Sequence, residues 1–292
     1  MTLTTFYERQ FAPLKLRSRS DNTKRLYQTT LRNFAKFLCR APTLRDFSDE
    51  TVSRFLGWLR ERGRSPYTVN KERSNVLAMW RFACRKNLVH DWPDVEPDVE
   101  PERVPVAWTE GEVLRLFRCV QTVPGRVGQT PASAWWLALL LVCWDTGERI
   151  GGVIHLLWRD VDLVGGWVLS PAEIRKGKKA DRLYKLAADT VTALRAIRPA
   201  RVLVDDPVFP WPYGHTYLWD AYGRLLRRAG LPHDSRSKFH RIRRSVASYY
   251  EAAGGNATEL LGHSCRRVTK RYLDPRIVER RFAVDLLFRP LH

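Results

Sequence analysis

The sequence lacks the cysteine arrangement of a disulfide-linked or zinc-binding domain. Its five cysteines are scattered over 292 residues, and none forms a CxxC pair. An extracellular domain held together by disulfides usually has an even number of cysteines, and a structural zinc site usually has them in close pairs. We therefore expect a protein of a reducing compartment, without a disulfide framework.

The sequence also lacks an apolar run long enough to cross a membrane. The longest run, from Ala134 to Trp144, falls well short of the roughly 20 apolar residues that a membrane helix needs, so it predicts a buried helix instead. The first residues, MTLTTFYERQFAPLKL, contain no continuous apolar segment of the length found in secretory signals. We expect a cytoplasmic protein with no membrane partner.

Acidic residues are scarce relative to basic ones. The chain has 50 Lys and Arg against 31 Asp and Glu, a net charge of +19. The excess is shared, because residues 1–95 carry 19 basic and 9 acidic side chains and residues 96–292 carry 31 and 22. Positive charge spread over folded parts of a chain favours binding to a nucleic acid, although an arginine-rich protein that is merely soluble is the alternative.

The first ninety residues have the periodicity of amphipathic helices. Apolar residues recur on one stripe in three segments, Ser20–Leu38, Asp49–Arg62 and Tyr67–Lys86. We expect residues 1–91 to form a small all-α domain of about four helices. A charge run on a helix is usually a solvated face, but several basic faces in one domain favour phosphate contact. The candidate DNA-binding residues here are Lys71, Arg73 and Arg81.

A spacer rich in proline and acidic residues follows. The segment DWPDVEPDVEPERVPV, residues 91–106, contains four prolines and the most concentrated acidic charge of the chain. Such a composition is typical of a polar, rather stiff linker. We place the linker at residues 92–106 and a second domain at residues 107–292.

The second domain mixes helical and strand-like patterns. Helical periodicity returns at Thr109–Val120 and Pro131–Asp145. A period of two then predicts three short strands at Asp160–Leu163, Trp167–Leu169 and Asp181–Leu186. Later helical segments are Asp189–Ile197, His215–Ala229, Phe239–Ala253 and an amphipathic tail at Pro275–His292. The chain is therefore expected to be mainly α with a small antiparallel sheet, and its second domain to be α+β.

Five short segments of this domain carry side chains suited to phosphate chemistry. They are TGER at Thr146–Arg149, RKGKK at Arg175–Lys179, HRIR at His240–Arg243, LLGHS at Leu260–Ser264 and TKRY at Thr269–Tyr272. Each has an ordinary explanation by itself: a surface arginine, a solvated turn, a chance spacing, a structural histidine or a packing tyrosine. Together they supply what a metal-free phosphoryl transfer requires, namely cations for the non-bridging oxygens, a nucleophile and a proton donor.

In their order and spacing, these segments resemble the catalytic motifs of the tyrosine recombinases, the family of the phage integrases. His263 and Tyr272 are nine residues apart, as in that family, and the helical segments SDNTKRLYQTTLRNFAKFL and SPYTVNKERSNVLAMWRFACRKNLV resemble its core-binding domain. The resemblance covers nearly the whole chain. It implies an N-terminal all-α (SAM-like) core-binding domain followed by an α+β catalytic domain with a C-terminal helical tail.

The same resemblance implies a nucleoid-associated, site-specific DNA recombinase that acts as a homotetramer on two double-stranded DNA sites, without metal, ATP or another cofactor. By position, Arg149 and Arg243 would hold the scissile phosphate. His240 would assist proton transfer, and His263 would donate to a non-bridging oxygen. Tyr272 would attack the phosphate and leave a 3′-phosphotyrosyl bond and a free 5′-hydroxyl.

Two positions depart from the family pattern. Family members commonly have a carboxylate three residues after the first arginine, where this chain has Gly152. Its loss would weaken activity unless another residue replaces it. The basic turn is one residue longer than usual, so Lys178 or Lys179, which are also candidate DNA-binding residues, could replace Lys176 as the general acid for the 5′-hydroxyl.

Three other functions remain open at this point. An integrase-like DNA-binding protein with a decayed active site is mildly favoured by Gly152, and covalent trapping would distinguish it from an active enzyme. A type IB topoisomerase would use the same residues, but it would not bring two DNA sites together. A metal-dependent nuclease is disfavoured because no cluster of Asp and Glu lies among the five segments.

Overall fold

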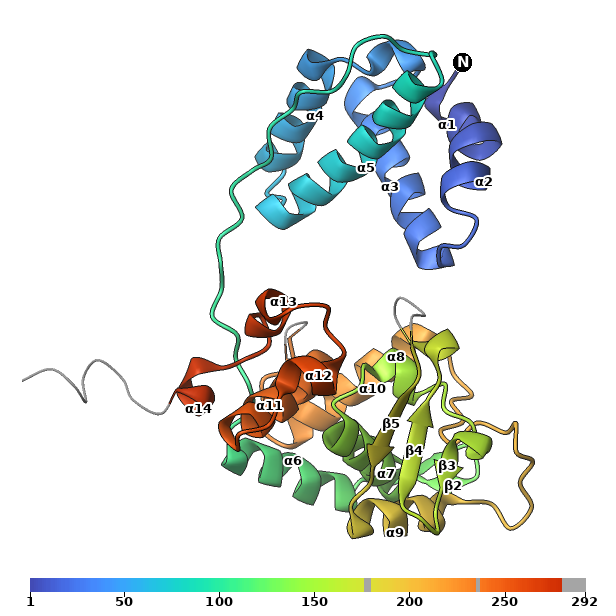
Figure 1. Ribbon diagram of the computed structural model, residues 1–292, viewed down its shortest axis with the longest axis vertical. Coiled ribbons are helices and arrows are strands. Elements are labelled where there is room, and N and C mark those ends of the chain that lie inside the picture. The colour runs from blue at the N-terminus through green and yellow to red at the C-terminus, as the bar shows by residue number, and fades with distance from the viewer. Residues whose placement is uncertain (176–179, 235–236, 280–292) are drawn as a thin grey trace, which may run out of the picture. The chain divides into compact units, whose positions relative to one another are not determined.

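The computed structural model describes residues 1–175, 180–234 and 237–279. The chain forms two compact units, an N-terminal unit from Met1 to Glu102 and a C-terminal unit from Arg103 onward (Figure 1). Helices dominate, and the two sheets are small and antiparallel, which confirms the predicted fold class. Among the described residues, no helix combines the length and the apolar character needed to span a membrane.

The N-terminal unit is built from helices. It contains α1 (Leu3–Phe6), the π-helical turn η1 (Tyr7–Phe11), α2 (Ala12–Lys15), α3 (Asp21–Leu38), the 3-10 turn η2 (Leu44–Asp46), α4 (Asp49–Glu61) and α5 (Pro66–Arg85). The three long helices begin and end within a residue or two of the predicted segments. Each begins after a serine, Ser20, Ser48 or Ser65, whose hydroxyl accepts a hydrogen bond from the backbone N–H three residues later. These bonds satisfy donors that a helix otherwise leaves open at its start.

Aromatic side chains form much of the core of this unit. Phe34 of α3, Phe55 of α4 and Trp80 of α5 are fully buried. The rings of Phe34 and Phe55 lie 5.0 Å apart between centroids. Burial of such large rings contributes several kcal/mol of hydrophobic stabilisation, on the order of 2 kcal/mol for each side chain, and fixes how the three helices pack.

The segment after α5 lies along the N-terminal unit before the chain leaves it. Residues 92–109 form no helix or strand. Arg73 nevertheless donates from Nε to the Val95 carbonyl at 2.6 Å, and Nε of Arg60 lies 2.9 Å from Oδ2 of Asp98. Val95 itself is buried. The first part of the acidic spacer is thus fixed to the N-terminal helices, and the compact unit extends to Glu102.

The C-terminal unit combines helices with a small sheet. Before the sheet come α6 (Glu110–Gln121), the short strands β1 (Arg126–Val127) and β2 (Thr130–Pro131), α7 (Ala132–Thr146), α8 (Ile150–Val153) and the 3-10 turn η3 (Trp158–Asp160). The sheet contains β3 (Val161–Asp162), β4 (Trp167–Ser170) and β5 (Arg182–Lys185), with the 3-10 turn η4 (Ala172–Ile174) between the last two. After it come α9 (Ala188–Ile197), α10 (His215–Arg228), α11 (Phe239–Ala252), α12 (Ala257–Leu261), α13 (Arg266–Lys270) and α14 (Pro275–Val278).

Helix α7 is the centre of this unit. Its buried residues, among them Trp135, Leu139 and Val142, lie around the whole helix, which packs against α6, α9 and α11 (Figure 1). The helix ends at Gly147, whose φ of 59° lies in the left-handed region. A Cβ there would lie 3.2 Å from side-chain atoms of both Val246 and Leu261, so the glycine lets α11 and α12 approach the end of α7.

The three-stranded sheet lies beside α7. Its order is β3-β4-β5, with all neighbours antiparallel and Val168 opposite Tyr184. These strands confirm the three that the period of two predicts. The basic turn between β4 and β5, residues 176–179, lies outside the described residues. So do residues 280–292, most of the predicted tail, of which α14 forms the beginning.

Candidate active site

Arg243 joins three segments of the C-terminal unit. It lies on α11 and its side chain is only 2% exposed. Its Nη1 donates to the carbonyl of Gly147 at the end of α7, and its Nη2 donates to the carbonyl of Leu261 at the end of α12, at 2.8 Å. A buried guanidinium is costly unless it has hydrogen-bond acceptors. These contacts therefore fix the ends of α7 and α12 against α11.

His263 and Tyr272 lie next to Arg243. The Nε2 atom of His263 is 3.4 Å from Nη2 of Arg243, and the rings of His263 and Tyr272 lie 4.8 Å apart between centroids. The Arg243 guanidinium carbon is 5.6 Å from the centroid of the Tyr272 ring. Three of the residues singled out from the sequence, on three separate segments, thus come together at one place.

The hydrogen bonds of His263 define its tautomer. Arg243 has only donors, so Nε2 of a neutral His263 accepts and its ring proton lies on Nδ1. Nδ1 is 3.1 Å from Oγ1 of Thr269, which in turn donates to Oγ1 of Thr258 at 2.9 Å. This chain of hydrogen bonds fixes the ring and leaves the Nε2 edge facing the guanidinium.

The site concentrates positive charge. Burial, followed by the charges of Arg243, Arg149 and Arg182, lowers the pKa of His263 to about 4. Burial, followed by the charge of Arg149, lowers the pKa of Arg243 to about 10. Because each pKa is lowered by neighbouring cations as well as by burial, the site disfavours further positive charge and favours an anion.

The glycine before His263 has a steric role. Gly262 ends α12 with a φ of 67°, in the left-handed region. A Cβ there would lie 2.8 Å from Nε of Arg182 and 2.9 Å from Nη2 of Arg175. Arg182 also donates to the carbonyl of Glu259. Residues at the two ends of the basic turn thus pack directly against the turn that presents His263.

The segment that carries Tyr272 is anchored just after the tyrosine. The Ser248 hydroxyl of α11 is 3.3 Å from the Tyr272 carbonyl and accepts from the N–H of Asp274 at 2.9 Å. The Asp274 carboxylate, fully buried, accepts from the N–H of Ala107 at 2.8 Å. The first and the last parts of the described C-terminal unit are therefore joined beside the tyrosine.

A buried carboxylate that the sequence analysis did not single out lies beneath the arginines. Glu148 accepts at Oε1 from Nε of Arg175 at 2.6 Å and from the Tyr184 hydroxyl at 2.9 Å. Its Oε2 accepts from the N–H of Arg149 at 3.1 Å and lies 3.8 Å from Nη1 of Arg243. Burial by itself would raise the pKa of this carboxyl, but Arg175, the hydroxyl and Arg243 together keep the pKa below its ordinary value.

The structure says less about the remaining predicted catalytic residues, Arg149, His240 and Lys176. Arg149 is half-buried at the start of α8, and its charge acts on Arg243 and His263. His240 is exposed on α11, three residues before Arg243. Lys176 lies outside the described residues.

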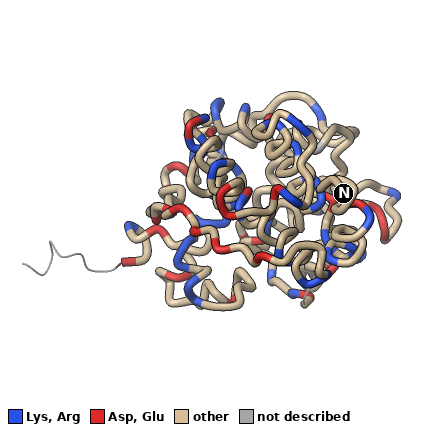
Figure 2. The backbone as a smooth tube through the Cα atoms, turned by 90° about the horizontal axis from the view of Figure 1, so that it is seen from above, with Lys and Arg blue, Asp and Glu red and all other residues tan. Residues whose placement is uncertain are grey.

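The candidate DNA-binding residues differ in their surroundings. Nζ of Lys71 is 2.9 Å from the buried Glu72 carboxylate, and Arg73 is engaged by the Val95 carbonyl. Arg81 is exposed. Lys178 and Lys179 lie outside the described residues. Lys and Arg occur in both units, and Figure 2 marks their positions along the backbone.

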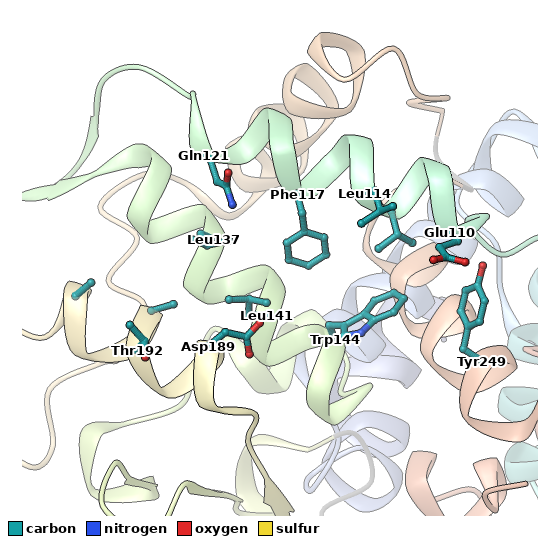
Figure 3. Close-up of a pocket in the computed structure, with 13 residues that line it drawn as sticks. Glu110, Leu114, Phe117, Gln121, Leu137, Leu141, Trp144, Asp189, Thr192 and Tyr249 are labelled. Carbon is teal, nitrogen blue, oxygen red and sulfur yellow. The ribbon is translucent and has the colours of Figure 1, made fainter. Parts of the chain in front are cut away.

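A groove of about 930 Å³ opens elsewhere in the C-terminal unit, between α6, α7, α9 and α11 (Figure 3). Apolar side chains line most of it, among them Phe117, Leu141 and Trp144. The described site residues Arg149, His240, Arg243, His263 and Tyr272 do not line it. Within residues 1–175, 180–234 and 237–279, no three His, Cys, Asp or Glu side chains gather as a metal site requires.

Two protein-family models match the chain. The model for the phage integrase family matches residues 108–277, and the model for the N-terminal SAM-like domain of phage integrases matches residues 10–87. Together they cover most of both units.

Individual proteins also match over nearly their full length. The chain is 25% identical over 272 residues to tyrosine recombinase XerD of Halalkalibacterium halodurans, covering 88% of each protein. It is 26% identical over 270 residues to tyrosine recombinase XerA of Thermococcus kodakarensis, covering 89% of this chain and 86% of that one.

Solved structures share the fold. A lambda integrase dimer bound to a COC′ core site matches with a TM-score of 0.71 at 18% identity, over 97% of this chain and 98% of that one. The Tn1549 transposon integrase in complex with a circular intermediate DNA matches with a TM-score of 0.74 at 15% identity, over 94% and 95%. A SAM-like N-terminal domain and an α+β catalytic domain, the expected combination, are thus the fold of this chain.

Proposed function

The chain belongs to the phage integrase family and is a site-specific DNA recombinase, and we propose that Tyr272 is the nucleophile with which it cuts DNA. The observation that supports this most directly is the meeting of Arg243, His263 and Tyr272. A tyrosine with a ring 4.8 Å from a histidine and 5.6 Å from a buried guanidinium lies where an anionic phosphorus centre is favoured.

The cations would hold the scissile phosphate. Arg149 and Arg243 would neutralise its non-bridging oxygens, and charge-assisted hydrogen bonds to such oxygens strengthen as charge redistributes at phosphorus. In the free protein Nε2 of His263 accepts from Arg243. To donate to a phosphate oxygen it would have to gain a proton, which the phosphate charge would favour. We therefore expect binding of the phosphate to be coupled to protonation of His263.

The reaction would exchange one ester bond for another. The Tyr272 oxygen loses its proton and bonds to phosphorus, the bond to the 5′-oxygen breaks, and that oxygen takes up a proton. His240, on the same face of α11 as Arg243, would assist these transfers. Lys176 remains the general acid that the sequence favours, with Lys178 and Lys179 as alternatives. Because the phosphotyrosyl bond retains the ester energy, religation to another 5′-hydroxyl needs no ATP.

We further propose the assembly in which the enzyme acts. Two units that both carry excess positive charge would together bind double-stranded DNA, and recombination between two sites would use a homotetramer, one subunit for each strand to be cut. The enzyme would work in the cytoplasm, beside the nucleoid.

Covalent trapping tests the nucleophile. The substrate is duplex DNA from the flanks of the gene, with a nick just beyond the cleavage position so that the short 5′-hydroxyl fragment diffuses away. We expect a protein–DNA adduct on a denaturing gel, in the presence of EDTA, that Tyr272→Phe abolishes. Tyr250→Phe, which alters an exposed tyrosine of α11, is the matched control and should still form the adduct.

Other outcomes would point elsewhere. An adduct that persists in Tyr272→Phe would mean that another residue is the nucleophile. Tight, specific binding without any adduct would favour a DNA-binding protein that has lost catalysis. An adduct formed by a monomer on one site, with supercoil relaxation and no pairing of two sites, would favour a topoisomerase.

A further inference from the structure

The position three residues after Arg149 has space that its glycine does not fill. Gly152 is buried, and a Cβ built on it would meet only Glu148 Oε2 at 3.8 Å and Ser170 Oγ at 4.0 Å, both ordinary contact distances. A cavity of about 10 Å³ lies here, and the same residues and Tyr184 are among those lining it. The Ser170 hydroxyl is buried without a hydrogen-bond partner among the described residues. A carboxylate from position 152 would find the Ser170 hydroxyl as a donor, but it would fit only where the Glu148 carboxylate is removed, because a cavity of about 10 Å³ holds no more than one water-sized group.

The carboxylate that is present lies at this same place but comes from a different residue. A Cβ at position 152 would lie 3.8 Å from Oε2 of Glu148. The Cγ, Cδ and carboxylate oxygen of a glutamate there would span this distance, so its carboxylate would reach the place that the Glu148 carboxylate now occupies. Either side chain would thus place a negative charge between α7, α8 and the sheet. Only one would be tolerated without cost, because two carboxylates in a buried space repel each other.

We propose that Glu148 is the positioning residue of this site, and that it supplies from the residue before Arg149 the carboxylate that the family commonly places three residues after it. This inference rests on the proposed function. The Glu148 side chain is 5% exposed, so it acts through other residues and not by touching DNA. It orients the arginines through the backbone N–H of Arg149 and through the nearby guanidinium of Arg243.

The same carboxylate connects the phosphate-binding arginines to the sheet. Its other oxygen holds Arg175 at the end of η4 and the hydroxyl of Tyr184 on β5. Arg175 in turn packs against Gly262, next to His263. Removal of the charge would leave the buried guanidinium of Arg243 and the partly buried guanidinium of Arg175 without their counterion, which disturbs their geometry more than the loss of a neutral contact would. The orientation of both Arg149 and His263 therefore depends on the Glu148 side chain.

A relocation experiment tests the inference. We compare Glu148→Ala, Gly152→Glu and the double variant with the unaltered protein by single-turnover cleavage of the nicked substrate and by DNA affinity. Glu148→Ala should cleave roughly 10- to 100-fold more slowly, the range found when a group that orients a functional residue is removed. Gly152→Glu should also cleave more slowly, because it adds a second carboxylate. The double variant should cleave faster than Glu148→Ala and recover most of this loss of rate.

Affinity separates positioning from binding. Because many phosphates of a duplex contribute to affinity, the Kd for DNA should change little in all variants while the cleavage rate changes. Glu148→Gln keeps the side-chain volume and one acceptor but removes the charge, so it should fold with a lower melting temperature than the unaltered protein and cleave more slowly. Glu173→Gln, which neutralises an exposed carboxylate two residues before Arg175, is the matched control and should cleave at the unaltered rate.

The results that overturn the inference are distinct from those that overturn the proposed function. A folded double variant no faster than Glu148→Ala, or a Glu148→Gln protein that folds and cleaves at the unaltered rate, would overturn the positioning role. If Glu148→Ala does not fold, Glu148→Gln decides. If the double variant regains its melting temperature but not its cleavage, the carboxylate only supports the fold and the inference is wrong. Absence of an adduct with the unaltered protein would instead count against the proposed function.

Discussion

The polar contacts that begin the helices of the N-terminal unit and those that build the site of the C-terminal unit differ in how far apart their partners lie in the sequence. In the N-terminal unit the contacts that begin the helices are local: Ser48 caps α4 through the N–H of Thr51, and the same pattern recurs at α3 and α5. In the C-terminal unit the contacts that build the site span much of the chain. Arg243 reaches the Gly147 carbonyl, 96 residues away, and Asp274 accepts from Ala107, 167 residues away. The helices of one unit therefore begin on contacts between neighbours in sequence, whereas the site of the other unit exists only when that unit is complete.

The largest effect is expected from breaking the longest of these contacts. Asp274→Ala leaves the buried N–H of Ala107 without an acceptor and should lower the free energy of unfolding of the C-terminal unit by about 2–3 kcal/mol. It should also slow cleavage, because Tyr272 lies two residues before the lost anchor. Hydrogen exchange resolved by mass spectrometry, in increasing urea, would assign the loss to this unit.

The matched control keeps an acceptor. Asp274→Asn retains one oxygen for the Ala107 amide and should lose clearly less stability than Asp274→Ala. Equal losses in the two variants would mean that the charge, through Arg276, and not the hydrogen bond to Ala107 holds the segment.

A smaller effect is expected from a local contact. Ser48→Ala removes the cap of α4 and should lower the free energy of unfolding of the N-terminal unit by about 1 kcal/mol. Hydrogen exchange of the C-terminal unit should stay unchanged. Ser53→Ala, at an exposed position in the middle of the same helix, is the control and should not destabilise it. A loss that spreads to α11 would contradict the view that the N-terminal contacts act locally.

The smallest expected effect is a change in the pKa of His263. We expect NMR to give a pKa near 4 for His263 in the free protein, because of burial and the charges of Arg243 and Arg149. Arg149→Met should raise this pKa, and so should DNA bound to the Tyr272→Phe variant. An imidazole whose pKa is the same with and without DNA would argue against its contact with the phosphate.

The lowered pKa of His263 also sets the sign of an acid effect. The unfolded chain has a histidine pKa of about 6.5 and takes up a proton first as the pH falls. The folded state resists protonation until about pH 4, so His263 makes the C-terminal unit lose stability progressively as the pH falls from about 6.5 towards 4. Because the ring is partly exposed, this loss is smaller than the pKa difference alone would suggest.

The separation of contacting residues along the sequence also decides which features the sequence predicts well. Helices α3, α4 and α5 and strands β3 to β5 are predicted almost to the residue, since capping serines and a period of two are local patterns. The meeting of Arg243, His263 and Tyr272 is expected only through the family resemblance, because no local pattern shows that residues 20 and 29 positions apart share a site.

Glu148 shows why the rest could not be predicted. In the sequence it is one acidic residue beside an arginine, and an acidic residue is usually exposed. Its partners Arg175 and Tyr184 lie 27 and 36 residues further on, and nothing in their own segments indicates a buried carboxylate. The available sign is indirect: a glycine stands where the family commonly has a carboxylate, and another acidic residue lies four positions earlier.

The bond between Asp274 and Ala107 also has a consequence for synthesis of the chain. As domains usually fold during translation from the N-terminus, the first unit can fold while the second is still being made. The 167 residues between Ala107 and Asp274 take on the order of ten to thirty seconds to translate at typical rates. Through that interval the nascent protein has a folded N-terminal unit but no anchored tyrosine. A ribosome that stalls within the second unit therefore releases a chain that lacks the complete candidate site.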